Sequence, residues 1–514
     1  MGAALLDRLA RQAVLAGGDR AWIEVRAPFT LGVLGRIPRG TPVDVAEAVR
    51  RARAAQPAWA AMGARQRARV ALRFHDLLLQ RSEQGLDLVQ LESGKARLHA
   101  LEEVLDTAIV SRYYARRAPR LLRRRRHRGA VPLLTATWEV RHPVGVVGVV
   151  SPWNFPLILS VTDAVAALLA GNAVVLRPDV QSSFTALWAA DLLREAGLPR
   201  DVLTVVTGEG AELGPALVGS VDYVMFTGST RTGRVVARQA AERLVGASLE
   251  LGGKNAMLVL EDAELERAVD GAVRGCFVGA GQVCVSIERV YVHEALYERF
   301  AARLAHRVRA MRLGAALDFD ADMGSLTTGR QLATVEAHVE DALSKGARLL
   351  AGGRRRPDVG PLFYEPTVLT GVAPGMTVHD EETFGPVVAL YSVRSDEEAI
   401  ERANASRYGL NASVWSGSAG RAMRVARRLQ AGMVNVNEAY AATWGSTAAP
   451  AGGVKESGLG RRHGEEGLLK YTTAQTIAVQ RGLPIAPRRP HRSRRYARVM
   501  TTLVRLMRHL PGLG

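Results

Sequence analysis

The 514-residue chain contains little cysteine, and this scarcity narrows what the protein can be. Only Cys276 and Cys284 occur, without a Cys-x-x-Cys motif or a pair of histidines four residues apart. Two cysteines cannot form a disulfide framework in a chain of this length, which indicates a reducing compartment, and we expect the cytoplasm. The sequence also offers no local cluster of metal ligands, so we predict no bound metal.

Long apolar runs are absent as well. The longest candidate, residues 157–176, is interrupted by Asp163 and by Gly171 with Asn172. This pattern favours a buried helix followed by a turn over a membrane span. The first residues, MGAALLDRLARQAV, do not resemble a secretory signal.

The net charge of +18 is concentrated in two segments. Residues 116–128 carry eight arginines and residues 481–514 carry nine, and neither segment contains an acid. The remainder is nearly neutral, so the charge reflects local features. For residues 116–128 a solvated surface or a subunit contact is favoured over polyanion binding, and we expect no nucleic-acid partner.

The C-terminal segment, residues 483–514, has the pattern of a basic amphipathic helix. Apolar side chains recur at helical spacing, and arginines fall mostly opposite them. The apolar set is Tyr496, Val499, Met500, Leu503, Met507 and Leu510, and the arginines are Arg495, Arg498, Arg505 and Arg508. Docking onto the rest of the chain or onto a neighbouring subunit is favoured; peripheral contact with an anionic membrane is the alternative.

The chain is too long for one hydrophobic core, so two large domains are expected. Strand-like segments alternate with helix-like ones such as residues 184–196, which predicts an α/β fold with a doubly wound parallel sheet. The expected strands are residues 144–150, 173–176, 202–206 and 222–226. Ligands of such sheets bind beyond the carboxyl ends of the strands.

The segment that follows the last of these strands, Gly228-Ser229-Thr230-Arg231-Thr232-Gly233, could hold a pyrophosphate at the start of a helix. Alone it is a weak signal, because it lacks a complete dinucleotide fingerprint. A second α/β region, residues 255–437, contains Cys284 in a turn before a strand. Glu250, at a glycine-rich strand end, could have a raised pKa and act as a base.

Six motifs together resemble the aldehyde dehydrogenase superfamily, in that family's order and across about residues 20–480. They are PWNFP (152–156), FTGSTRTG (226–233), ELGGKN (250–255), GQVC (281–284), ETFGP (382–386) and GGVKESGLGRRHG (452–464). The resemblance implies Cys284 as nucleophile, Asn154 as oxyanion donor and Glu250 as the base for thioester hydrolysis. It implies cofactor contacts from Trp153, Arg177, Gly228, Ser229, Gly233, Leu251, Glu382 and Phe384.

The same resemblance implies the domain plan. Residues 1–250 would form a Rossmann-type cofactor domain, interrupted by a bridging hairpin at about 130–146, and residues 251–437 a catalytic domain. Residues 438–482 would return to the cofactor domain and supply a bridging strand. Because the family's bridging strands join subunits, a homodimer or homotetramer is expected.

Departures from the family pattern bear on the cofactor. Where many members have Lys-Pro-Ser-Glu, this chain has Arg177-Pro178-Asp179-Val180. The missing carboxylate and the available guanidinium favour NADP over NAD. The acid that the family carries in its Gly-Arg-Glu motif is here Arg462, which leaves Glu250 as the one candidate base.

The substrate is less well determined. The overall pattern is most similar to a bacterial subgroup described as succinic-semialdehyde dehydrogenases. The arginines that bind the substrate carboxylate in better-studied members correspond to Thr162 and Val278. Succinate semialdehyde is therefore the first hypothesis, a medium- or long-chain apolar aldehyde the second, and a non-catalytic binding protein a remote third.

Overall fold

The computed structural model describes residues 2–130, 134–481 and 493–509. Backbone contacts divide the chain into two units. The larger comprises Met1–Leu121 with Pro143–Thr472, and the smaller Leu122–His142 with Thr473–Gly514. The two units are therefore described one after the other.

A six-stranded sheet of the larger unit contains the four strands that the sequence predicts. Its order is β19-β9-β8-β5-β6-β7. The strands are β5 (Val146–Ser151), β6 (Ala173–Pro178), β7 (Leu203–Val205), β8 (Tyr223–Thr227), β9 (Gly246–Glu250) and β19 (Gly458–Leu459). All neighbours pair in parallel except β9 with β19, so the expected doubly wound parallel sheet is confirmed.

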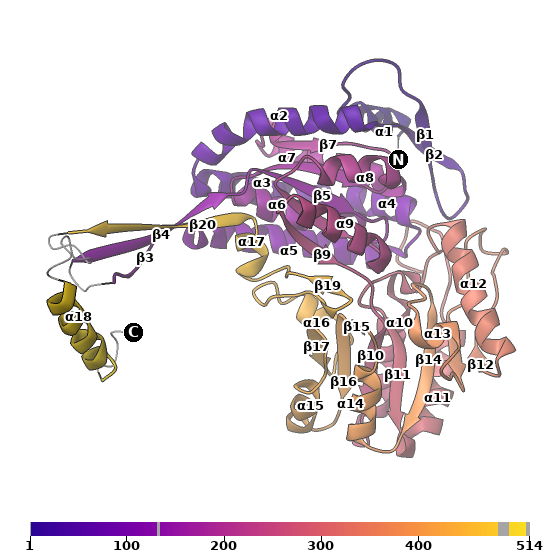
Figure 1. The fold of residues 1–514 in the computed structure, drawn as a ribbon. Helices are drawn as coiled ribbons and strands as arrows, with labels where there is room; N and C mark the ends of the chain where they lie inside the picture. Colours follow the sequence, from indigo (N-terminus) through magenta and orange to yellow (C-terminus); the bar gives the residue numbers. More distant parts are fainter. Residues whose placement is uncertain (1, 131–133, 482–492, 510–514) are drawn as a thin grey trace. The chain divides into compact units, whose positions relative to one another are not determined.

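Helices cover both faces of this sheet (Figure 1). On one face lie α2 (Pro42–Ala61), α8 (Gly210–Val218) and α9 (Thr230–Glu242). On the other lie α6 (Pro156–Leu169) and α7 (Ser183–Glu195), with α3 (Ala64–Gln80) and α5 (Arg97–Leu121) packed outside α6. Every residue of α6 is buried, and a turn with Gly171 at φ +99° leads into β6, which confirms the expected buried helix.

A seven-stranded sheet forms the second half of the larger unit, in the order β12-β13-β14-β11-β10-β16-β17. Its strands are β10 (Asn255–Val259), β11 (Ile287–His293), β12 (Arg348–Ala351), β13 (Thr367–Thr370), β14 (Val387–Val393), β16 (Asn411–Trp415) and β17 (Met433–Val436). Only β12 runs antiparallel to its neighbour. The helices of this half are α10 (Leu265–Phe277), α11 (Glu294–Arg309), α12 (Gly329–Ser344), α13 (Thr377–Asp380), α14 (Asp396–Asn404) and α15 (Ala419–Ala426).

The larger unit also contains several peripheral elements. These are α1 (Ala3–Ala10), β1 (Trp22–Arg26), β2 (Val33–Pro38), α4 (Ser82–Ser93), β15 (Tyr408–Gly409), α16 (Ala441–Trp444), β18 (Val454–Lys455) and α17 (Glu466–Leu469). Short 3₁₀ turns occur at Val180–Ser182, Arg200–Val202 and Val278–Gly281.

The smaller unit consists of a three-stranded sheet and a C-terminal helix. The sheet has the order β20-β4-β3, with β3 (Arg125–Arg128), β4 (Thr135–Pro143) and β20 (Thr472–Gln480). The hairpin begins earlier than the expected residue 130, because the arginines at the end of residues 116–128 form its first strand. Most of these arginines are exposed, and Arg124 lies 5.3 Å from the Trp138 ring.

The C-terminal helix α18 (Ser493–Met507) appears where the amphipathic pattern places it. None of its described residues is buried. Leu510, the last apolar position of the pattern, lies outside the described residues. No helix in the described part of the chain is long and apolar enough to cross a membrane.

Candidate active site

Cys284 lies in a turn whose backbone is held from several sides. Before it, Gly279, Ala280 and Gly281 adopt positive φ angles of 56°, 56° and 71°. A Cβ atom at Gly281 would lie 2.0 Å from the Gly385 carbonyl oxygen, so only glycine fits there. After it, Asn255 Nδ2 donates to the carbonyl oxygens of Cys284 and Ser286 at 2.8 and 2.7 Å. The turn therefore presents the thiol from a fixed backbone.

The thiol faces a largely apolar pocket. Cys284 and Asn154 both line it, so the structure brings these two predicted residues together. The other lining residues are Glu102, Asp106, Phe155, Ile158, Leu159, Val283, Val285, Tyr440 and Trp444. The pocket encloses about 480 Å³ with its open mouth included.

Asn154 is ready to donate a further hydrogen bond. Its Nδ2 donates to the Gln282 carbonyl oxygen at 2.9 Å, and an amide nitrogen carries a second hydrogen. The side chain is buried. This arrangement fixes the amide beside Cys284 while leaving one N–H for a ligand oxygen.

Glu250 is the last residue of β9. Burial raises the pKa of its carboxyl to about 7, and the positive charge of Arg462 opposes this rise most strongly. Burial also raises the pKa of the Cys284 thiol to about 12, and the charge of Glu250 adds to that increase. The two predicted residues are therefore within electrostatic reach of each other, and Glu250 Oε1 is buried with no hydrogen-bond partner in the described chain.

The remaining predicted residues follow the carboxyl ends of strands. Ser229 caps α9 by accepting a hydrogen bond from the Thr232 N–H at 3.3 Å, and the Gly228 N–H donates to the Glu250 carbonyl oxygen at 3.1 Å. A Cβ atom at Gly233 would lie 2.4 Å from Leu251, so glycine allows α9 to pack on that side chain. The N-terminus of α9 thus lies beyond the carboxyl end of β8, a position at which helices can bind phosphate.

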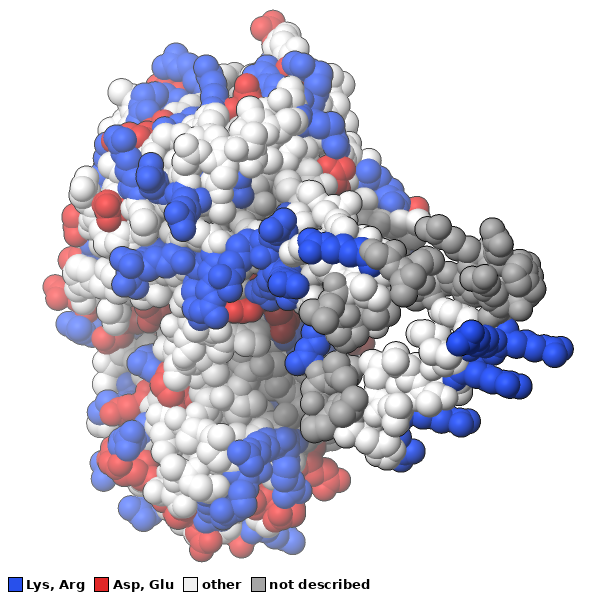
Figure 2. Space-filling view, turned by 90° about the vertical axis from the view of Figure 1, so that its left-hand side faces the viewer, with Lys and Arg blue, Asp and Glu red and all other residues white. Residues whose placement is uncertain are grey.

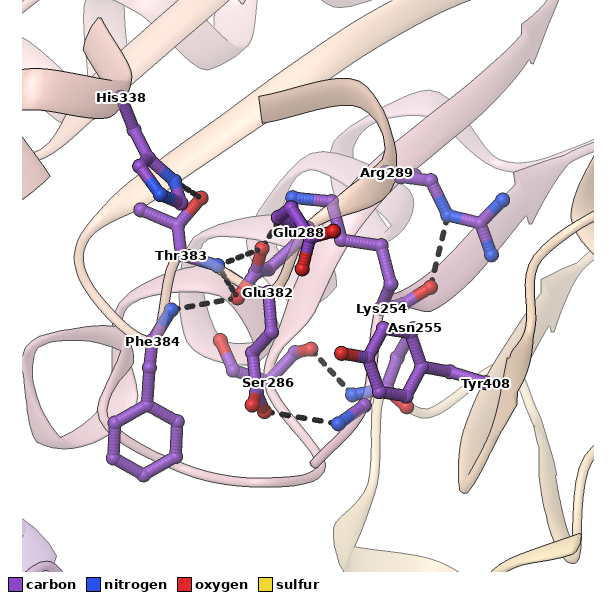
Figure 3. Close-up of polar contacts among 12 residues, drawn as sticks. Lys254, Asn255, Ser286, Glu288, Arg289, His338, Glu382, Thr383, Phe384 and Tyr408 are labelled. Atoms are coloured by element: carbon purple, nitrogen blue, oxygen red, sulfur yellow. Dashed lines mark hydrogen bonds and ion pairs between the residues drawn. The ribbon is translucent and has the colours of Figure 1, made fainter. Parts of the chain in front are cut away.

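Trp153 and Phe384 meet although 231 residues separate them, with ring centroids 5.6 Å apart and edge-to-face. The loop that carries Phe384 is fixed by Glu288, which accepts hydrogen bonds from the N–H groups of Thr383 and Phe384 at 2.9 and 3.0 Å (Figure 3). Glu288 itself pairs with the buried Lys254 at 2.5 Å. In the same loop, Glu382 accepts from the Gly253 N–H at 2.9 Å, and burial raises its pKa to about 8.

Arg177 lies apart from these residues, at the end of β6. Its Nη2 donates to the Gly208 carbonyl oxygen at 2.9 Å, and the side chain is buried. Its Nε is buried with no hydrogen-bond partner among the described residues. The guanidinium thus lies at the end of β6 and retains an unused donor.

One face of α5 carries residues that sequence reasoning missed. His99 accepts a hydrogen bond from the Gly279 N–H at 3.2 Å. Glu103 accepts from the N–H groups of Leu157 and Ile158 at 2.8 and 3.2 Å, while Glu102 and Asp106 line the pocket. Their spacing of i, i+3, i+4 and i+7 is the signal that could have found them.

Lys95 completes this support. Its buried ammonium pairs with Glu103 and donates to the Asn154 carbonyl oxygen at 2.7 Å. It also lies 3.5 Å from the centroid of the Phe155 ring. A buried ion pair thus fixes both the Asn154 backbone and the start of α6.

Comparison with known proteins shows the family to which the chain belongs. The fold and the pocket define a class of protein. It is an α/β protein that combines a doubly wound parallel sheet, of the kind that binds dinucleotides, with a thiol in a pocket. The model of the aldehyde dehydrogenase family matches residues 15–477, and the chain belongs to this family. It is an aldehyde dehydrogenase, as the six motifs predict.

Several relatives and solved structures are similar along nearly the whole chain. A Mycolicibacterium smegmatis protein provisionally named succinate-semialdehyde dehydrogenase [NADP(+)] is 52% identical over 484 residues, 94% of each chain. The 3-sulfolactaldehyde dehydrogenase of Pseudomonas putida is 38% identical and covers 88% of this chain and 93% of its own. A Staphylococcus aureus betaine aldehyde dehydrogenase solved with NAD+ has a TM-score of 0.89 at 32% identity, covering 94% of this chain and 99% of its own.

We predict that replacing Glu103 by Gln lowers stability by about 3–5 kcal/mol, because the buried Lys95 charge loses its partner. Thermal unfolding measures the loss. The double variant Lys95→Met, Glu103→Gln should recover much of it. Glu264→Gln is a matched control, since Glu264 forms an exposed ion pair with Arg267 at 3.4 Å; equal losses in Glu103→Gln and this control would contradict the role of the pair.

Proposed function

We propose that Cys284 attacks the aldehyde carbon. The supporting observation is that Cys284 shares its pocket with the Asn154 amide, whose free N–H can stabilise the oxyanion together with the backbone N–H of Cys284. Collapse of the adduct leaves an acyl group on the Cys284 sulfur as a thioester. Glu250 then removes a proton from the water that hydrolyses this thioester, and a carboxylic acid leaves.

The dinucleotide supplies the acceptor for the hydride that the adduct loses. The residues present fit such a group: the N-terminus of α9 with Ser229 and Gly233 suits the phosphates, and Glu382 with Phe384 and Trp153 suits the nicotinamide end. We propose that residues 1–250 and 438–482 serve the cofactor and residues 251–437 the thiol chemistry. Gly228 and Leu251 contribute by fixing the backbone beside Glu250.

We favour NADP as this cofactor. Arg177 places a positive charge with an unused donor at the end of β6. Many family members have a glutamate where this chain has Val180, and the carboxylate of that glutamate would repel a 2′-phosphate. The Mycolicibacterium relative is named for NADP, whereas the Staphylococcus structure contains NAD+. Arg177 and Val180 together favour NADP over NAD.

Succinate semialdehyde is the substrate that we propose first, and the names of the relatives at 49–52% identity support it. A second candidate, an apolar aliphatic aldehyde, is favoured by the pocket itself. Of the described residues that line it, none is Lys or Arg, and Glu102 and Asp106 place two carboxyl groups in an otherwise apolar wall. A substrate carboxylate would meet no cation there.

We further propose that the protein is a cytoplasmic homodimer or homotetramer. The strand β20 lies at the edge of its sheet, and eight of its nine residues are exposed. An exposed strand at the edge of a sheet is a ready site for pairing with a second copy.

Peripheral contact with an anionic membrane is our proposal for α18. Four of its apolar side chains, Val499, Leu503, Val504 and Leu506, are exposed. Residues 493–509 contain five arginines and no acid. Figure 2 shows the arginines of this helix projecting together, away from its uncharged surface. Interfacial helices combine these two faces to bind lipid.

The nucleophile and the base can be separated by kinetics. We expect Cys284→Ala to abolish oxidation of every aldehyde while dinucleotide binding persists.

Glu250→Gln should slow turnover about 100-fold or more but retain a pre-steady-state burst of reduced cofactor, because hydride transfer precedes hydrolysis. With a base whose pKa is about 7, wild-type turnover should fall as pH drops below that value. Loss of the burst in Glu250→Gln would contradict its assignment.

Initial rates at 340 nm test the substrate and the cofactor. We expect a higher kcat/KM with succinate semialdehyde than with decanal, and with NADP than with NAD. A preference for decanal would instead support the apolar aldehyde that the pocket favours. Butanal is a matched control for chain length without the carboxylate.

Vesicle sedimentation tests the tail. The full chain should sediment with vesicles that contain phosphatidylglycerol and much less with pure phosphatidylcholine, and salt should weaken the binding. A chain that ends at residue 482, or the variant Leu503→Glu, should remain in the supernatant. Equal recovery of all forms in the supernatant would rule out this surface and favour docking within the oligomer.

A further inference from the structure

The pocket that contains Cys284 has two carboxyl groups in its wall, and both come from α5. Glu102 and Asp106 lie four residues apart, so one face of this helix carries both of them to the pocket. The surface of the pocket is otherwise mostly apolar, and none of its described lining residues is Lys or Arg. The end of a bound aldehyde that lies away from the thiol therefore has these two acids as its main polar neighbours.

The two acids differ in their hydrogen bonds. Tyr440 Oη donates to Oε1 and Oε2 of Glu102 at 3.1 and 3.0 Å. Asp106 is 7% exposed, and its Oδ2 is buried with no hydrogen-bond partner in the described chain. Asp106 therefore brings an unused polar atom to the pocket wall.

The nearby cations are engaged with other acids. Lys95 pairs with Glu103, and Arg462 pairs with Asp163 at 3.0 Å. Within residues 2–130, 134–481 and 493–509, no ion pair joins Asp106 to a cation. A buried carboxylate without a cation is strongly unfavourable, so the surroundings of Asp106 favour its neutral, protonated form.

The charges around Asp106 act in the same direction. Burial raises the pKa of Asp106 to about 7, and the neighbouring acids Glu103 and Glu102 add to this rise. A hydrogen bond from Trp444 and the positive charge of Arg462 oppose it. Near neutral pH a large share of Asp106 therefore carries an O–H group, which is a hydrogen-bond donor.

The second acid strengthens this effect. Burial also raises the pKa of Glu102, opposed first by its hydrogen bond from Tyr440 and then by the charges of Lys95 and Arg274. A carboxylate that enters the pocket brings a further negative charge close to both acids. Like charges disfavour ionisation, so such a ligand stabilises the protonated form of Asp106.

We propose that the neutral Asp106 side chain donates a hydrogen bond from its O–H to the carboxylate of succinate semialdehyde and thereby selects this substrate. The inference rests on the proposed function, in which Cys284 attacks the aldehyde at the other end of the molecule. A hydrogen bond to an ionised acceptor is about twice as strong as one between neutral groups. A carboxylic acid thus does the work of the arginines that the pocket lacks.

The ratio of kcat/KM for succinate semialdehyde to kcat/KM for butanal, measured from pH 6 to pH 9, tests the proposal. Both aldehydes undergo the same chemistry, so the titrations of Cys284 and Glu250 cancel in the ratio. The O–H of Asp106 is present below its raised pKa of about 7 and is lost as the pH rises through that value. Because kcat/KM reports the free enzyme, the wild-type ratio should fall about tenfold or more between pH 7 and pH 8.5.

Two variants separate hydrogen-bond donation from structural damage. In Asp106→Asn an amide N–H donates at every pH, so the ratio should stay high and become independent of pH. In Asp106→Leu the donor is lost, and the ratio at pH 6 should fall about 10- to 100-fold. Asp270→Asn is the control, because Asp270 forms an exposed ion pair with Arg307; this variant should keep the wild-type profile.

Three results would overturn the proposal. The first is a wild-type ratio that does not change with pH, and the second is an Asp106→Asn variant that loses the preference as Asp106→Leu does. The third is a preference for 4-(trimethylammonio)butanal over butanal that grows with pH, because that result would make Asp106 an ionised acceptor for cationic substrates. If Asp106→Leu does not fold, the wild-type and Asp106→Asn profiles decide.

The proposed function fails in a different way. A wild-type enzyme that oxidises butanal but not succinate semialdehyde at pH 6 would remove the substrate assignment and this inference together. A clear preference for succinate semialdehyde with a flat pH profile would leave that assignment standing and remove only the role of Asp106. Turnover that survives in Cys284→Ala would instead remove the nucleophile.

Discussion

The buried ion pair between Lys95 and Glu103 is the interaction on which the geometry of the site depends. Glu103 accepts the first N–H groups of α6, and Lys95 donates to the Asn154 carbonyl oxygen. The loop that carries the proposed oxyanion donor is thereby fixed at both ends. Removing two charges from water costs free energy, so such a pair is tolerated only when its remaining hydrogen bonds are satisfied. The pair therefore depends on the same backbone groups that it holds in place.

The same physical device recurs around the site. Glu288 accepts two consecutive N–H groups at the 383–384 turn and pairs with Lys254, and Asp163 joins Arg462 and Lys470. In each case a buried acid links segments far apart in sequence. Because an unpaired buried charge is strongly unfavourable, each acid admits one arrangement of its loop. These pairs fix the loop before α6 that carries Asn154 and the 383–384 turn that carries Phe384.

Much of the fold could be predicted from local sequence. The four expected strands of the first sheet, the buried helix at residues 157–169 and the amphipathic helix at the C-terminus all appear in the structure. Hydrophobic periodicity and turn residues are local properties, so they are readable without tertiary information. The hairpin start was placed too late because charged residues at 125–128 give no strand pattern.

The site was only partly predictable, for a physical reason. The motifs identified Cys284, Asn154 and Glu250 because chemistry restricts which residue types can serve there. Glu102 and Asp106 on the pocket wall have only their helical spacing as a local signal, and the pairing of Arg462 with Asp163 has none. The sequence by itself therefore determined the family, much of the secondary structure and the candidates for the reactive residues. The tertiary structure decided which charges meet, because burial and distance arise only when segments hundreds of residues apart pack together.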